Sequence, residues 1–357
     1  MKENYDDGYY HLGKDLELYP DAWCYIVFSK RGPGKTYSSL WYSYYNNIKI
    51  IYMKRTIEDV NLICSANEFG FDPSPYVPIN RDKYLNIKPM KIKDGIGAFW
   101  NALEDGSKDG LPISYILALN AIKKFKGFDF SNCDWILFDE FIPQVGEVVK
   151  RGEGEMLLDL YMTVARDRQK RGKKPLKLIL FANAEDISTP VTNTLEVVDD
   201  MAELVASGER YSYIEDRGIL IHHITTEEIP LKDEEKEGIY SAMAHTSWAK
   251  KSFEGEFANN DFSNVGRISL KNYKPYIHLT YKTYDYYIYI NDKGQYYVCS
   301  SKQKCLFDYD LNKENDQKLY WVEHGIDLRF ECINGNVKFK RYTMYDLVVN
   351  YKTFFKI

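Results

Sequence analysis

One stretch of the chain decides its fold: residues 26–42 read IVFSKRGPGKTYSSLWY. An apolar run typical of a buried strand leads into a glycine-rich loop, and a segment predicted to be helical follows the loop. The loop matches the phosphate-binding pattern G-x-x-x-x-G-K-[ST], except that Ser29 stands where the pattern has glycine. A strand, a tight loop and a helix in this order predict a site in which backbone amides surround a phosphate group.

Each residue of the loop has an expected role if the ligand is ATP. Gly32 and Gly34 provide backbone freedom, and Pro33 fixes the turn between them. Lys35 is expected to reach the β- and γ-phosphates, and the Thr36 hydroxyl is expected to bind Mg²⁺. The predicted nucleotide-binding residues are Ser29, Lys30, Arg31, Gly32, Pro33, Gly34, Lys35, Thr36 and Tyr37. The alternative interpretation is a basic turn without a ligand.

A second motif supplies the acidic half of such a site. Residues 133–141 read CDWILFDEF, a buried strand that ends in Asp139 and Glu140. Asp139 is expected to hold Mg²⁺, directly or through water, and Glu140 to activate the attacking water. The long separation from the loop leaves room for an additional strand between the two motifs. The alternative is a solvated acid pair at a strand end.

Two further polar residues are candidates for the same site. A helix is predicted over residues 155–171, and it places Arg166 on its surface. An arginine presented to a neighbour's γ-phosphate accelerates hydrolysis about 10³- to 10⁵-fold, and this role requires a ring of subunits. Asn183 ends the apolar strand at 176–184 and is a candidate γ-phosphate sensor. Its alternative role is to cap a turn.

The remaining pattern predicts the architecture. Continuous apolar strands alternate with helices in residues 1–222, which predicts an α/β domain with a mostly parallel sheet covered on both faces. A charged segment at 223–262 is expected to be a helical linker. Residues 263–357 alternate in the manner of strands and are expected to form a smaller α+β domain.

Composition excludes several classes of protein. A net charge of −5 argues against a protein that coats nucleic acid through bulk charge, but it permits local basic surfaces. Six cysteines without metal or redox spacing predict free thiols in a reducing compartment. The polar, acidic start predicts no signal peptide, and no apolar run approaches the ~20 residues of a membrane span. A soluble, intracellular protein is expected.

Several segments together resemble the genome-packaging ATPases of phi29-like phages, compact relatives of the large terminases. They are FSKRGPGKTY, WILFDEF, TVARDRQKR, LILFANA and, near the end, CINGNVKFKRYTMYDLVVNYKTFF. The resemblance covers nearly the whole chain, with poorer matches at residues 56–95 and in the linker. It implies a P-loop ATPase of the additional-strand type, followed by an RNase H-like domain. No acid cluster can be assembled on the strands of that domain, so we expect it to lack nuclease activity.

The resemblance also implies partners and a location. The family forms a homomeric ring, a pentamer in the best-known case, at the portal of an empty procapsid. The ring drives double-stranded DNA inward with ATP and Mg²⁺, and a packaging RNA is a further candidate partner. The expected location is the host cytoplasm at the portal vertex, and not the mature virion. The residues that carry over are Lys35, Thr36, Asp139, Glu140 and, as the arginine acting in trans, Arg166.

A lysine-rich segment is the candidate DNA contact. Lys126 falls where the family places a DNA-contacting loop residue in the pore, and Lys123 and Lys124 stand beside it. Lysines that hold phosphates without reading bases suit a protein that must release DNA in every cycle. The alternative is three solvated lysines on a loop.

Three rival functions stay open on the sequence alone. They are a terminase-type ATPase with an active nuclease, a helicase, and an adaptor protein in which ATP only holds subunits together. The adaptor stays open because of Ser29, which fits a phosphate loop if its backbone φ is negative or its side chain points away.

Overall fold

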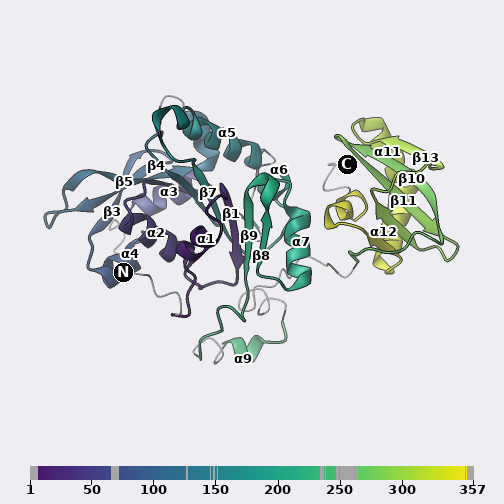
Figure 1. Ribbon diagram of the computed structural model, residues 1–357, viewed down its shortest axis with the longest axis horizontal. Coiled ribbons are helices and arrows are strands. Elements are labelled where there is room, and N and C mark those ends of the chain that lie inside the picture. Colours follow the sequence, from purple (N-terminus) through teal and green to yellow (C-terminus); the bar gives the residue numbers. More distant parts are fainter. Residues whose placement is uncertain are drawn as a thin grey trace. The chain divides into compact units, whose positions relative to one another are not determined.

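The computed structural model describes residues 7–65, 72–125, 128–144, 146–147, 149–150, 152–233, 237, 239–246, 249, 262, 264–349 and 351. The chain divides into two compact units (Figure 1). The first comprises Met1–Val197 with Ser207–Asn260, and the second comprises Val198–Ala206 with Asp261–Ile357. No helix in the described part of the chain is long and apolar enough to cross a membrane.

The first unit is built on a nine-stranded sheet in the order β3-β4-β5-β2-β6-β7-β1-β9-β8. Every pairing from β5 to β9 in this order is parallel, and antiparallel pairings occur only toward the two edges. The expected α/β fold with a mostly parallel sheet is therefore confirmed. Its strands are β1 (Cys24–Ser29), β2 (Ile50–Lys54), β3 (Ile87–Lys93), β4 (Ile96–Ala102), β5 (Lys108–Ala118), β6 (Trp135–Asp139), β7 (Lys177–Asn183), β8 (Tyr211–Ile214) and β9 (Ile219–Ile224).

The central strands explain where a site can form. Residues of β1 and β6 are buried throughout, as expected of strands covered on both faces. Strand β7 lies between β1 and β6 and pairs with both in parallel. The carboxyl ends of the three strands therefore meet at one edge of the sheet, where ligands of α/β proteins bind.

Helices connect the strands. Within residues 56–95, which match the resembled family poorly, the described part of the chain forms two helices and β3. A capping box of Thr56 and Asp59 begins the first of these helices. The helical elements are α1 (Leu12–Leu18), α2 (Lys35–Tyr45), α3 (Ile57–Cys64), α4 (Val77–Lys83), η1 (Leu119–Phe125), α5 (Glu153–Ala165), η2 (Gln169–Arg171), α6 (Pro190–Thr194), α7 (Val198–Ser207), η3 (Glu215–Arg217), α9 (Ile239–Met243), α11 (Glu314–Tyr320), η5 (Trp321–Gly325), α12 (Ile326–Ile333) and η6 (Tyr342–Leu347).

One helix is shorter than its sequence predicts. The expected helix over 155–171 ends at Ala165, so the prediction is wrong for its last turns. Arg166 is extended, with ψ 129°, and Asp167 has φ 57°. The reason is tertiary, because the buried Arg168 side chain donates to the carbonyl oxygens of Cys133 and Lys174. An uninterrupted helix through residues 166–168 would not place the Arg168 side chain where it makes these contacts.

The second unit has its own five-stranded sheet in the order β13-β10-β11-β12-β14. Strands β10, β11 and β12 form an antiparallel meander, whereas β13 and β14 pair in parallel with β10 and β12. Its strands are β10 (Tyr273–Tyr281), β11 (Tyr284–Asn291), β12 (Tyr296–Cys299), β13 (Phe307–Asp310) and β14 (Val337–Phe339). The final residues, 352–357, lie outside the described part of the chain.

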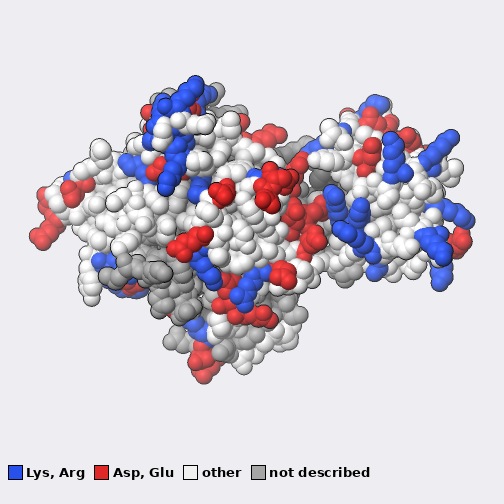
Figure 2. All heavy atoms as spheres, in the orientation of Figure 1, with Lys and Arg blue, Asp and Glu red and all other residues white. Residues whose placement is uncertain are grey.

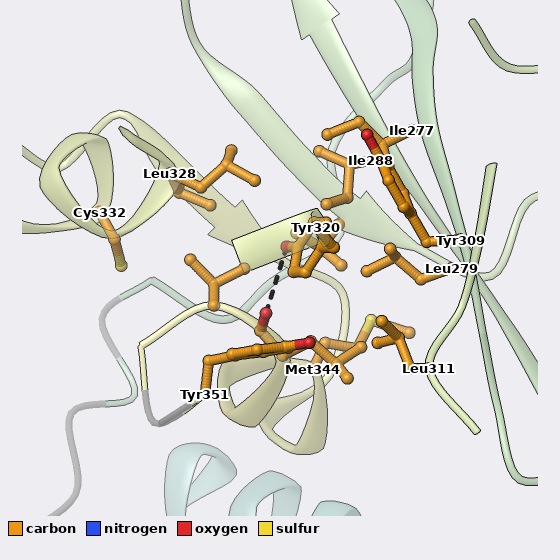
Figure 3. Close-up of a cluster of buried hydrophobic side chains, with 14 of the residues drawn as sticks. Ile277, Leu279, Ile288, Tyr309, Leu311, Tyr320, Leu328, Cys332, Met344 and Tyr351 are labelled. Atoms are coloured by element: carbon orange, nitrogen blue, oxygen red, sulfur yellow. Dashed lines mark hydrogen bonds between the residues drawn. The ribbon is translucent and has the colours of Figure 1, made fainter. Parts of the chain in front are cut away.

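A separate hydrophobic core supports this second sheet (Figure 3). Alternate residues of β10 and β11, among them Ile277, Leu279 and Ile288, point into it and are fully buried. The Tyr320 hydroxyl lies at the centre and donates to the Leu347 carbonyl oxygen at 3.2 Å. A core of its own is what an independently folding domain requires.

The second unit also differs from the first in charge. Over Val198–Ala206 and Asp261–Ile357 it holds 15 Lys and Arg against 14 Asp and Glu, whereas the first unit holds 32 against 38. Lys and Arg side chains are spread over the visible face of this unit in Figure 2. The acidic excess of the protein therefore lies in the first unit.

Candidate nucleotide site

The glycine-rich loop joins β1 to α2 in the predicted conformation. Gly34 is the residue before α2, with φ 90°, a left-handed conformation that glycine adopts without strain. A Cβ at this position would lie 3.3 Å from the Tyr9 ring. The Tyr10 amide donates to the Pro33 carbonyl oxygen at 2.8 Å. The N-terminal segment therefore packs against the loop and supports it. The first backbone amides of α2, like those of any helix, have no acceptor within the helix.

The N-terminal segment is anchored by a buried ionic network. The Asp15 carboxylate accepts from the Tyr10 hydroxyl at 2.9 Å and lies 2.9 Å from His222 Nδ1. On the other side of the ring, His222 Nε2 lies 3.0 Å from Glu228. Burial alone would lower the pKa of His222, but the carboxylates of Asp15 and Glu228 raise it to about 9. His222 is therefore a cation at neutral pH.

Lys35 is buried at the start of α2, and its ammonium group points back into the loop. It donates to the Ser29 hydroxyl, to the Lys30 carbonyl oxygen at 3.3 Å and to Asn183 Oδ1 at 3.4 Å. Burial lowers the pKa of Lys35 to about 8, although Asp139 and Glu140 oppose the shift. A buried cation held mainly by neutral oxygens is poised to receive an anionic ligand.

The serine in place of glycine does not strain the loop. Ser29 is not among the described residues with positive φ, so its Cβ costs nothing there. Its side chain does not point away, however. The hydroxyl donates to the Lys30 carbonyl oxygen at 2.6 Å and accepts from Lys35. Ser29 thus orients the lysine rather than blocking the loop.

The acidic strand end faces the first turn of α2. The Thr36 hydroxyl lies 3.2 and 3.1 Å from the two carboxylate oxygens of Asp139. The Tyr52 hydroxyl donates to the same carboxylate at 2.8 Å. A hydroxyl and a carboxylate beside a phosphate loop are the protein ligands that Mg²⁺ uses when nucleotide phosphates supply others. The described residues contain no cluster of three or more metal-binding side chains, which is compatible with such a site.

Glu140 stands next to this pair in an unusual conformation. Its φ is 59°, a left-handed value that is rare outside glycine and that often marks functional sites. Its carboxylate lies 2.9 Å from the Lys54 ammonium and 3.5 Å from the Gln144 side-chain amide. About half of the side chain is exposed, so the carboxylate is within reach of solvent and of a bound ligand.

Lys54 was not predicted from the sequence, yet it contacts both acids. Its ammonium group lies 3.4 Å from Asp139 and 2.9 Å from Glu140. Burial alone would lower the pKa of Lys54, but Tyr52 and the two carboxylates raise it well above its usual range. In the sequence, Lys54 could be recognised only as a residue near the end of a predicted strand. Its place beside the two acids follows only once β2 is known to pair with β6.

Asn183 and Tyr37 occupy different surroundings. Asn183 ends β7 in register with Ser29, and its side chain reaches Lys35. Tyr37 lies one residue after Thr36 on α2, where burial and the Asp82 carboxylate raise the pKa of its phenol. The structure therefore brings Asn183, but not the Tyr37 hydroxyl, toward the lysine of the loop.

The two arginines after α5 are very different. Arg166 is the C-terminal capping residue of α5, is exposed, and has no hydrogen bond or ion pair with another described residue. Arg168 is 3% exposed and pairs with Asp134 at 2.8 Å. Arg166 is thus available to another molecule, whereas Arg168 holds the chain together.

The predicted DNA-contacting lysines are only partly described. Lys123 and Lys124 lie on η1, which follows β5, but their side chains are outside the description. Lys126 is itself outside the described residues. Arg31 of the loop is described, and it donates to the Gln144 side chain at 3.2 Å. The lysine prediction therefore stays a prediction.

Two solved structures share this fold across nearly the whole chain. One is the bacteriophage phi29 viral genome packaging motor assembly, with a TM-score of 0.64, 17% identity, and coverage of 97% of this chain and 99% of that chain. The other is the phi28 gp11 DNA packaging motor, with a TM-score of 0.58, 15% identity, and coverage of 99% of each chain. No protein-family model and no curated protein matches the chain. The resemblance noted in the sequence is thus confirmed at the level of the fold.

Proposed function

We propose that this chain is the ATPase subunit of a viral motor that packages double-stranded DNA. The observation that carries the proposal is the meeting of Lys35 and Thr36, which begin α2 after β1, with Asp139 at the carboxyl end of β6. The fold that the chain shares with two phage packaging motors is independent support for the proposal. We further assign the first unit to the P-loop ATPases of the additional-strand type, because β7 lies between β1 and β6.

The residues present fit ATP with Mg²⁺. When bound, Mg²⁺ would supply positive charge that offsets the charge of the phosphate groups. Thr36 and Asp139 would hold it, while Lys35 and the loop amides would hold the phosphates. Glu140 accepts the proton of the attacking water, and Asn183 orients the γ-phosphate or the water from the end of β7.

The site requires a second subunit. Arg166 is exposed, and its side chain makes no hydrogen bond or ion pair with another described residue, so it is suited to complete a neighbour's site in a ring. We expect this ring, a pentamer as in the family that the sequence resembles, to sit at the portal of the procapsid in the host cytoplasm. It grips DNA phosphates through Lys123, Lys124 and Lys126, and it is absent from the mature virion. A packaging RNA is a further candidate partner.

We interpret residues 263–357 as an RNase H-like domain without nuclease activity, joined to the ATPase domain (1–222) by a linker at 223–262. An antiparallel meander whose first strand pairs in parallel with β13 supports the fold assignment. Asp285 lies on β11, 2.9 Å from His278, and Asp308 lies 3.2 Å from the same ring. A histidine between the two acids disfavours a two-metal nuclease site.

The test is steady-state ATP hydrolysis as a function of protein concentration, with and without long double-stranded DNA. We expect activity to rise cooperatively with protein concentration and to increase with DNA, because a subunit alone lacks the neighbour's arginine. Activity that is indifferent to concentration, DNA and substitution of Arg166 would leave a nucleotide site without a packaging motor. Turnover absent in every oligomeric state would favour the adaptor function instead.

A further inference from the structure

Arg55 is a buried arginine next to the site with three partners on different segments. Its Nε lies 3.2 Å from both carboxylate oxygens of Glu153, and its Nη1 lies 2.7 Å from Glu147. Its Nη2 donates to the Phe141 carbonyl oxygen at 2.6 Å. One planar guanidinium group thus joins the end of β2, the chain just after Glu140, and the first turn of α5.

The contact with α5 is the most buried of these. Glu153 is 4% exposed and is the first residue of the helix. Burial raises the pKa of its carboxyl group, and the Arg55 charge opposes that shift. Breaking one side of a buried pair leaves an uncompensated charge, so the two groups hold each other in place.

The same helix turn also packs tightly on its other side. A Cβ at Gly154 would lie 2.4 Å from the Pro190 carbonyl oxygen of α6, so the two helix backbones are in close contact there. Farther along, α5 is held mainly by the buried apolar side chains of Leu157, Leu160 and Val164. Apolar packing is not directional, whereas the Arg55–Glu153 pair fixes where the helix starts along its axis.

Arg166 lies at the far end of this helix. It follows Glu153 by thirteen positions in the chain. At a rise of ~1.5 Å per residue this is roughly 20 Å. A helix transmits a displacement of its first turn along its length, and a misplacement of about 1 Å at a catalytic group can cost on the order of 10²-fold in rate.

We propose that Arg55 is a positioning residue that, through Glu153 and α5, sets where Arg166 is presented to the neighbouring subunit. The inference rests on the proposed function, since it requires Arg166 to act in trans. The same guanidinium group also binds the carbonyl oxygen of Phe141, the residue after Glu140. Arg55 therefore connects a subunit's own site with the arginine that acts on the neighbouring subunit.

The decisive variant is Glu153→Ala. It removes the α5 contact and leaves Arg55 bonded to Phe141 and Glu147, so the subunit's own site should remain intact. We expect the affinity for a fluorescent ATP analogue to be unchanged, and DNA-stimulated hydrolysis to fall about 10- to 100-fold. The matched control is Tyr161→Phe, which removes a hydrogen bond from the same helix to the Leu176 carbonyl and should leave hydrolysis unchanged.

Mixed rings then show whether the defect acts in trans. Glu153→Ala subunits are mixed with Glu140→Gln subunits, which cannot hydrolyse ATP themselves but carry an intact α5 and Arg166. We expect the mixture to hydrolyse ATP several-fold faster than either variant alone. The reference mixture of Arg166→Ala with Glu140→Gln tests the proposed function itself, because it should recover activity by the same logic.

The outcomes separate the two proposals. Recovery in the reference mixture but not with Glu153→Ala overturns the role of Arg55 and leaves the shared site standing. Failure of both mixtures removes the shared site, and the role of Arg55 with it. Wild-type hydrolysis by Glu153→Ala alone also overturns the inference. If Glu153→Ala loses ATP affinity through misfolding, Glu153→Gln takes its place, because it keeps the size of the side chain but removes the charge and one of the two oxygens that face Arg55 Nε. It is judged by the same recovery in the same mixtures.

Discussion

The phosphate loop and the segment after α5 each carry a cationic side chain, but the two cations differ in burial and in bonding. In the loop, the Lys35 cation is buried and surrounded by oxygens of its own subunit. After α5, the Arg166 cation is exposed and bonded to no other described residue. Two residues later, Arg168 returns to the buried, fully bonded pattern.

The difference suggests a division of the proposed active site between two subunits. The groups proposed to bind a nucleotide are already oriented by contacts inside one chain. The group proposed to stabilise the transition state is exposed, and its side chain makes no hydrogen bond or ion pair with another described residue. An exposed arginine without a partner in its own chain can act in catalysis only if a second chain brings a phosphate group to it.

The sharpest test of this contrast is Arg166→Ala. We expect hydrolysis by the DNA-stimulated assembly to fall about 10³- to 10⁵-fold, the range for arginines that act in trans. The melting temperature should not change, because the side chain is exposed. Measuring both on one preparation checks the comparison, and a variant that retains wild-type turnover would falsify the trans assignment.

The next largest effect concerns Glu140. Glu140→Gln keeps the shape of the side chain but removes the base, so hydrolysis should fall by about 10²- to 10⁴-fold. Affinity for a fluorescent ATP analogue should stay near that of the wild type, since Lys35 and Thr36 are untouched. A loss of affinity that parallels the loss of rate would assign Glu140 to binding instead.

Arg168→Ala reverses the pattern expected for Arg166. Removing this buried side chain leaves the carbonyls of Cys133 and Lys174 without a donor, so we expect a loss of about 3 kcal/mol in the free energy of unfolding. Urea denaturation measures it, and Arg166→Ala is the matched control with no expected loss. Equal stabilities of the two variants would contradict the division between them.

The smallest expected effect tests the support of the loop by the N-terminal segment. The His222 pKa is about 9 in the folded protein, above its ordinary value, so the folded state binds the extra proton. Its stabilisation is complete below about pH 6.5 and is lost as pH rises through 9, which amounts to about 2 kcal/mol between pH 7 and 9. Urea denaturation of the wild type and His222→Gln across this range should show the slope only in the wild type.

Much of the site was predictable because its parts are local in the sequence. The loop is one continuous segment, and the acids end a strand whose apolar residues are adjacent. Asn183 was found for the same reason, at the end of the next buried strand. The strand order then brings these three segments together without further information from side chains.

The parts that sequence reasoning missed depend on distant contacts. Lys54 becomes a partner of the acids only when β2 is placed beside β6, which no local pattern states. The end of α5 was placed too late because helix-forming residues continue past Ala165. There the contacts of Arg168 with the 131–134 segment outweigh local propensity.

The position of Lys54 bears on how the site is emptied. When product and metal leave a site with two adjacent carboxylates, the exposed negative charges attract the cation back and slow its departure. Here an ammonium group within 3.4 Å of one carboxylate and 2.9 Å of the other is a permanent counterion that replaces the departing charge. On the proposed function, we expect Lys54 to shorten the residence time of ADP, so that Lys54→Ala would release ADP more slowly.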